Sequence, residues 1–86
     1  MIDFTGYRIP DYMTDGIVRY LENGIEPGGF LSAVICNDLR GAFGRADETN
    51  ARLIGEYVRF FYNEVPSPAW GSPEKMEAWM ASRRTP

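Results

Sequence analysis

A Pro-Gly-Gly turn at residues 27–29 opens directly into a run of apolar residues, and this combination constrains the fold more than any other feature of the chain. The apolar residues recur at steps of three and four, which places them on one face of a helix. We therefore predict a central, buried helix over residues 29–40, with the polar pair Asn37-Asp38 as its terminating signal. Its predicted buried face comprises Leu31, Val34, Ile35, Leu39 and Ala42.

Residues 47–64 carry the most regular helical pattern of the sequence. Asp47 is the expected N-cap, and the acidic Glu48 follows in the first turn, where the helix dipole favours negative charge. Leu53 and Phe60 widen the apolar arc beyond one stripe, so this helix is either packed on two sides or partly exposed. The predicted inner face consists of Ile54, Tyr57, Val58, Phe61, Tyr62 and Val65.

Two further helices are predicted at residues 10–23 and 72–83. Gly24 is expected to end the first in the left-handed conformation, and Ser72 is expected to cap the last. The inner faces of these two helices are predicted to be Met13, Ile17, Tyr20 and Leu21 in the first, and Met76, Trp79 and Met80 in the second.

The fold class follows from these patterns: a single all-α domain over residues 1–86, built from four helices. The first nine residues are expected to form an extended arm whose aromatic side chains fill gaps between helices. Gly41 and Gly44 weaken a continuous helix, so we expect a kink or a short separate turn over residues 40–45.

The absence of histidine restricts the chemistry of this chain of 86 residues. Histidine is the commonest general base near neutral pH, so Ser-His-Asp and Cys-His machinery is excluded, and we expect no enzymatic activity. Cys36 is the single cysteine, which excludes a disulfide within the chain. No metal or other cofactor is expected. A chain this short has a thin stability margin, so we expect it to form a homo-oligomer.

Net charge and hydropathy restrict the classes of partner that we expect for this chain. The net charge of −3 makes nucleic acid an unlikely partner. No apolar run is long enough to cross a membrane, and the N-terminus lacks the pattern of a secretory signal. A cytoplasmic location is expected, in agreement with the lone thiol.

An apolar partner-binding surface is predicted around the end of the 47–64 helix. Leu53 and Phe60 lie on the widened arc, and Trp70 stands in the stiff proline-containing loop that follows it. Trp70 forms an aromatic-rich patch with Tyr62 and Phe60, and such patches anchor protein interfaces or stack on bases. The alternative is that Trp70 closes the small core as a lid.

A second candidate site would bind an anion. Gly28 and Gly29 can present free N–H groups at a helix start, and Arg40, Arg45 and Arg52 fall on one short segment, where they can converge on a phosphate. The alternative is that Gly28 and Gly29 form a plain helix entry and that the arginines pair with nearby surface carboxylates.

Several short segments resemble known sequences: RYLENGI (19–25), PGGFL (27–31), NDL (37–39), RAD (45–47), YNE (62–64) and WGSPEK (70–75). Together they resemble a family of small accessory proteins encoded by bacteriophages and prophages, to which no activity is assigned. The resemblance covers most of the chain and implies a viral accessory gene expressed in a bacterial cytoplasm. It transfers no role to any individual residue.

Three functions remain open at this stage. The first is a non-catalytic protein that binds and inhibits a host protein, such as a defence protein. The second is a sponge that sequesters a nucleotide-type immune signal in a pocket, which can lie between subunits. The third is a structural role in the virion or in its assembly.

Overall fold

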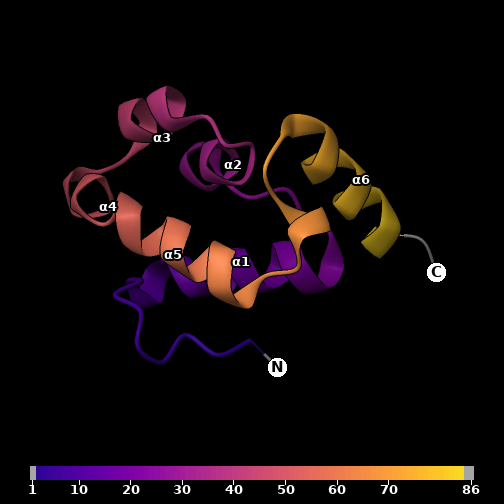
Figure 1. The fold of residues 1–86 in the computed structure, drawn as a ribbon, viewed down its shortest axis with the longest axis horizontal. Coiled ribbons are helices and arrows are strands. Elements are labelled where there is room, and N and C mark those ends of the chain that lie inside the picture. Colours follow the sequence, from indigo (N-terminus) through magenta and orange to yellow (C-terminus); the bar gives the residue numbers. More distant parts are fainter. Residues whose placement is uncertain (1, 85–86) are drawn as a thin grey trace.

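The computed structural model describes residues 2–84, and the described part of the chain is helical without β-strands (Figure 1). The all-α fold class is therefore confirmed, but six α-helices and one 3₁₀ turn replace the predicted four helices. They are α1 (Asp11–Asn23), α2 (Gly29–Ile35), α3 (Leu39–Arg45), α4 (Glu48–Arg52), α5 (Ile54–Glu64), η1 (Ser67–Ala69) and α6 (Pro73–Arg84).

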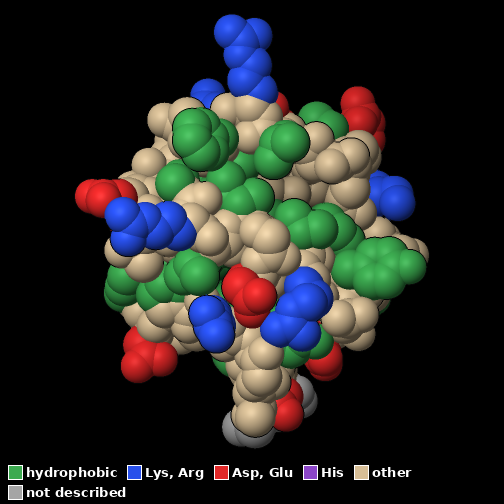
Figure 2. Space-filling view, turned by 60° about the vertical axis from the view of Figure 1, so that its left-hand side comes forward, with side chains coloured by type: hydrophobic (Ala, Val, Ile, Leu, Met, Phe, Trp, Pro, Cys, Tyr) green, Lys and Arg blue, Asp and Glu red, His purple; other side chains and the backbone are tan. Residues whose placement is uncertain are grey.

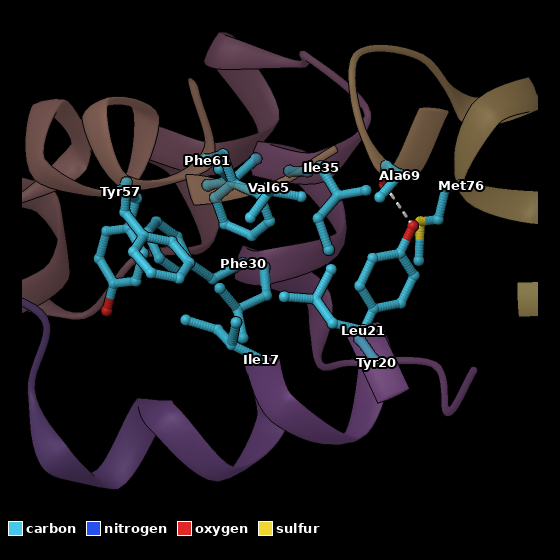
Figure 3. Close-up of a cluster of buried hydrophobic side chains, with 14 of the residues drawn as sticks. Ile17, Tyr20, Leu21, Phe30, Ile35, Tyr57, Phe61, Val65, Ala69 and Met76 are labelled. Carbon is cyan, nitrogen blue, oxygen red and sulfur yellow. Dashed lines mark hydrogen bonds between the residues drawn. The ribbon is translucent and has the colours of Figure 1, made fainter. Parts of the chain in front are cut away.

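The hydrophobic core lies where α1, α2 and α5 face one another (Figure 3). Tyr57 and Phe61 of α5 and Ile17 of α1 are all fully buried. The ring of Phe30 meets that of Tyr57 edge-on at 5.0 Å between centroids. Large aromatic side chains contribute most of the buried apolar area in a domain of this size, so α5 organises the interior.

Hydrogen bonds satisfy the polar groups that this core encloses. The hydroxyl of Tyr20 donates to the carbonyl oxygen of Ala69 at 2.6 Å, and that of Tyr57 donates to Oδ1 of the buried Asn50 at 2.6 Å. Unsatisfied buried hydroxyls cost about 1–3 kcal/mol, so these two bonds fix how α1 meets the η1 loop and how α4 meets α5.

The predicted continuous helix over residues 29–40 is wrong, because the chain turns at Asn37. Asn37 has a positive φ of 62°, which asparagine tolerates better than most residues. The N–H of Asn37 donates to the carbonyl of Val34 and that of Asp38 to the carbonyl of Ala33, which is a Schellman motif. The role predicted for Asn37-Asp38 as a helix terminator is thereby confirmed.

Asp38 then starts the next helix. Its carboxylate Oδ1 accepts the N–H of Gly41 at 2.9 Å, so it is the N-cap of α3. Gly41 and Gly44 lie inside the short separate helix α3, which agrees with the second of the two alternatives expected over residues 40–45, while the change of direction itself occurs at Asn37. The change of direction also carries Leu39 out of the core: its side chain is 70% exposed, although a buried position was predicted.

The predicted helix 47–64 is divided at Leu53 into α4 and α5. Asp47 caps α4 as expected, since its carboxylate accepts the N–H of Asn50 at 2.7 Å. The predicted inner face of α5 needs two corrections, because Val58 is 43% exposed and Tyr62 is 78% exposed. The core covers Tyr57 and Phe61 of the same helix, whereas the side of α5 that carries Val58 and Tyr62 is left uncovered.

Phe60 is fully buried, and the N-terminal arm explains why. The ring of Phe4 stacks on that of Phe60 at 4.8 Å, and the ring of Tyr7 meets it edge-on at 5.3 Å. The arm is fixed by a hydrogen bond from Arg59 to the carbonyl of Gly6 at 2.7 Å. The Phe60 side of the wide apolar arc is thus covered by the chain itself, whereas Val58 and Tyr62 leave another side of the arc exposed.

The termini of α1 and α6 match their predicted signals. Gly24 follows α1 with φ 67°, and the hydroxyl of Ser72 accepts the N–H of Lys75 at 3.1 Å. Met76 and Met80 of α6 are buried, and the indole N–H of Trp79 donates to the carbonyl of Leu21. Across residues 2–84, no helix has both the length and the hydropathy needed to cross a membrane.

Candidate functional site

An apolar groove lies where the α2–α3 corner, α5 and the loop after η1 meet. Its volume is about 100 Å³. The turn residues Asn37 and Asp38 close one end of it. Its apolar walls are formed by Val34, Leu39, Ala42, Ile54, Val58 and Trp70, and we call this set the apolar groove.

The loop that carries Trp70 is held firmly against the core. The N–H of Gly71 donates to the carbonyl of Ile35 at 2.7 Å, and the hydroxyl of Tyr20 holds the carbonyl of Ala69. One side of the Trp70 ring lies against Phe61, with 5.6 Å between ring centroids. Trp70 is therefore half-buried: it covers part of the core and also forms a wall of the groove.

Two walls of this groove, Leu39 and Val58, are large exposed apolar side chains, and each has another such side chain four positions further along its helix. Leu39 and Phe43 of α3 are 70% and 65% exposed, and they stand one helical turn apart on the same face. Val58 and Tyr62 of α5 have the same spacing and are also exposed. Figure 2 looks onto the side of the molecule that carries α3 and α4, where exposed hydrophobic side chains gather between charged ones.

The predicted partner-binding residues separate in the structure. Trp70 lines the groove, whereas Leu53 is half-buried at the α4–α5 junction and packs against the core. Phe60 lies under the N-terminal arm and is inaccessible to a partner in this conformation.

Sequence reasoning missed the exposure of Leu39, Phe43 and Val58, and it placed Tyr62 both on a buried helix face and in the aromatic patch with Phe60 and Trp70. The available signal was their spacing, because each helix carries a pair of large apolar residues four positions apart. Three of these residues were instead assigned to buried faces, and Phe43 was assigned to neither face.

A second, more polar hollow lies on the other side of the Asn37-Asp38 turn. Its volume is about 480 Å³, and Gly29, Ala33 and Cys36 are among its lining residues. A neighbouring hollow adds Met76 and Met80 of α6. The two hollows share several lining residues, among them Glu26 and Cys36, and we call them together the carboxylate cleft after their lining residues Glu26, Asp38 and Glu77.

The predicted anion-binding residues meet only in part. Gly29 and Arg45 both line the carboxylate cleft, and the Arg45 side chain passes so close to Gly29 that an added β-carbon would stand 3.0 Å from its Cδ. Gly28 caps α2 and Arg40 is exposed on α3, and neither lines the cleft. Arg52 pairs with Glu48 at 2.9 Å on the surface.

The electrostatic character of the cleft is negative. Among the described residues that line it, Glu26, Asp38 and Glu77 face a single cation, Arg45. Burial raises the pKa of the Cys36 thiol, and the negative charges of Asp38 and Glu74 raise it further. Cys36 is thus kept as a thiol, with its Sγ 3.5 Å from the sulfur of Met76.

Over residues 2–84, no three His, Cys, Asp or Glu side chains are grouped so that they could hold a metal ion. Comparison of the chain with known protein families, with curated proteins and with solved structures gives no match.

Proposed function

We propose that this chain is a non-catalytic accessory protein that acts by binding another protein through the apolar groove. In line with the resemblance to phage proteins, the proposed partner is a host protein of the bacterial cytoplasm, such as a defence protein that is inhibited by the binding. The observation that carries the proposal is that the groove has two large, exposed apolar walls, Leu39 and Val58, and that the same helices expose Phe43 and Tyr62 one turn further on.

Energetics support a protein partner. Burying one large apolar side chain contributes about 1.5–3 kcal/mol, so four such residues can supply the central anchors of an interface. The floor of the groove is rigid, because Val34 and Ala42 are buried and Trp70 is held by its loop. A preformed apolar surface loses little conformational entropy when it binds. Such patches on small proteins mark interaction sites.

The experiment compares two variants as bait and as purified protein. Leu39→Ser/Val58→Ser removes two exposed apolar walls of the groove and leaves its buried floor intact. Ile25→Ser is the matched control, because Ile25 is 50% exposed but lies in the connection between α1 and α2, outside the groove. A host protein captured by the wild type is identified, purified and titrated by calorimetry.

We expect the groove variant to bind the identified partner at least about 10-fold more weakly than the wild type, and the Ile25→Ser control to bind within about 2-fold. Circular dichroism checks that both variants remain folded. Equal affinity of the groove variant and the wild type would overturn the proposal.

The nucleotide sponge is the second candidate, and one contact favours it. Arg45 lies against Gly29 at the wall of the carboxylate cleft, as a phosphate site would require. Against it stand Glu26, Asp38 and Glu77, which repel a phosphodiester in the same cleft. Calorimetry with cyclic dinucleotides and ADP-ribose derivatives tests this candidate, and heat of binding that Arg45→Gln abolishes would favour it over protein binding.

A virion or assembly role uses the same kind of apolar contact, with a viral protein as partner. It is distinguished by location: the chain would be abundant in purified particles. Its absence from particles, together with capture of a host protein, favours the first proposal.

A further inference from the structure

We propose that the partner segment in the apolar groove carries lysine or arginine next to its apolar anchor, and that this basic side chain enters the carboxylate cleft. The inference rests on the proposed function and names the chemistry of the partner. Its basis is the position of Asp38, which lines both the groove and the cleft.

The groove and the cleft meet at the Asn37-Asp38 turn: Asn37 lines the groove, and Asp38 lines both. The Schellman bonds of α2 fix the backbone of this turn on one side, and the cap of α3 fixes it on the other. The carboxylate of Asp38 is exposed, and a carboxylate can accept further hydrogen bonds beyond the one from Gly41. A chain seated in the groove thus passes directly beside a rigidly placed negative charge.

Charge complementarity selects a basic segment. Glu26, Asp38 and Glu77 line the cleft, and the ion pairs of the described residues, Arg52–Glu48 and Arg59–Glu56, involve none of them. Asp38 already lies beside Arg45, because its Oδ2 and the Nη1 of Arg45 approach the same point above Gly41. Glu26 and Glu77 leave the cleft with a net negative charge towards an incoming cation. An acidic segment would be repelled here, whereas Arg45 alone offers it attraction.

The floor of the cleft suits the stem of such a side chain. Ala33, Met76 and Met80 present apolar surface beneath the carboxylates. Lysine and arginine bury their aliphatic stems on apolar surface and keep the charged group at its edge. Methionine adapts its shape to different occupants. An apolar floor with acidic edges accommodates both parts of a basic side chain.

A random dodecapeptide library provides a probe that needs no known partner. It is panned on the immobilised wild type, and peptides that also bind Leu39→Ser/Val58→Ser are removed. A selected peptide is then synthesised and titrated against two triple variants. Glu26→Gln/Asp38→Asn/Glu77→Gln neutralises the cleft, and its matched control, which removes the same charge outside the groove and the cleft, is Asp15→Asn/Glu22→Gln/Asp47→Asn.

Both triple variants are designed to stay folded. Each replaces one N-cap aspartate, Asp38 or Asp47, by asparagine, which keeps an oxygen that can accept the capping hydrogen bond. The two variants therefore differ in where charge is removed and not in the number of caps that are changed. We expect the selected peptides to combine an aromatic or leucine residue with at least two lysines or arginines. Each exposed charge pair contributes about 3-fold in affinity, so loss of three pairs should weaken binding to the cleft triple about 27-fold, whereas the control should bind within about 2-fold of the wild type.

Three results would overturn the inference, and they are distinguishable from failure of the proposed function. Groove-dependent peptides without basic residues would show that the groove binds but that the cleft plays no part. Equal affinity of the cleft triple and the wild type would show the same. Equal losses of peptide affinity in both triple variants would indicate that the peptide is attracted by the overall negative charge of the protein and not by the cleft. If panning yields no peptide that depends on Leu39 and Val58, both proposals fail together.

Discussion

Three consecutive aromatic residues of α5 meet three different environments. Phe60 is fully buried beneath the N-terminal arm, Phe61 is fully buried against Trp70 and the core, and Tyr62 is 78% exposed. Each step along a helix rotates the side chain by about 100°, so neighbours face different surroundings. The comparison teaches that the aromatic content of α5 serves two purposes, an interior on one side and an available surface on the other.

The two sides also differ in the hydrogen bonds that support them. On the interior side, the hydroxyls of Tyr20 and Tyr57 each donate to a defined acceptor. On the groove side, the short helix α3 carries the exposed Leu39 and Phe43. It is capped by Asp38, and the turn before it depends on the positive φ of Asn37. The interior therefore determines stability, and the groove side is free to be shaped for binding. The predictions that follow test this division.

The largest effect is expected for Phe61→Ala. Removing this fully buried ring leaves a cavity and should lower the free energy of unfolding by about 3–5 kcal/mol. Urea denaturation followed by circular dichroism measures it. Phe61→Leu keeps most of the apolar volume and should lose less. A loss below about 1 kcal/mol for Phe61→Ala would show that this side of α5 is not the interior.

The second-largest effect is expected at alkaline pH, which should lower the free energy of unfolding. Burial raises the pKa of Tyr20 from 10.0 to about 12, so the unfolded chain loses this proton at lower pH than the folded chain does. The stabilisation is complete below pH 10 and is lost as the pH rises towards 12, by about 2–3 kcal/mol. Denaturation at several pH values measures the fall.

Tyr20→Phe is the control for the alkaline effect. It removes the titrating hydroxyl, so its stability should fall less steeply over the same pH range, although the hydrogen bond to Ala69 is lost at every pH. The pKa of Tyr57 is also raised by burial, and it contributes a fall of the same sign. Parallel curves for the wild type and Tyr20→Phe would contradict the assignment.

A smaller effect is expected at the turn that creates the groove. Asn37→Ala places alanine at a φ of 62° and should lower the free energy of unfolding by about 1 kcal/mol. Asn37→Gly should be neutral or slightly stabilising, because glycine adopts this conformation without strain. Thermal melts of the two variants measure the difference, and equal stability would show that the turn at Asn37 is not strained by alanine.

The smallest effect on stability is expected at the exposed apolar side chains of α3 and α5. Phe43→Ala and Tyr62→Ala should each change the free energy of unfolding by less than about 0.5 kcal/mol, because their side chains already contact water. Urea denaturation measures both. A loss above about 2 kcal/mol at either position would place that residue in the core and would remove the basis for a binding surface there.

Local signals in the sequence correctly identified several features. Asp47 and Ser72 cap helices as predicted, Gly24 follows α1 with a positive φ, and the Asn37-Asp38 pair ends α2. Each of these features depends on a few adjacent residues whose side chains or φ preferences favour one local structure. The all-α class follows for the same reason, since helical periodicity is a local property.

The error at Leu39 arose where two local signals competed. The periodic pattern from Leu31 to Ala42 suggested one helix, but the Schellman turn at Asn37 outweighs it and rotates Leu39 outward. The error at Val58 and Tyr62 has another cause, because both lie in the unbroken helix α5 together with the buried Tyr57 and Phe61. Spacing gave the predicted inner face its width, but only contacts with other segments decide which part of that width is covered.

The sequence by itself therefore determined the helical class, the cap residues and the supply of apolar side chains. Tertiary structure alone decided which of those side chains are covered. The arm that buries Phe60 contacts a residue more than 50 positions away, and the groove gathers Val34, Ile54 and Trp70 from three separate segments. Coverage depends on contacts between distant segments, and periodicity carries no information about them. The same contacts place Asp38 between an apolar groove and an acidic cleft, although the sequence shows only a polar residue at the end of a helix.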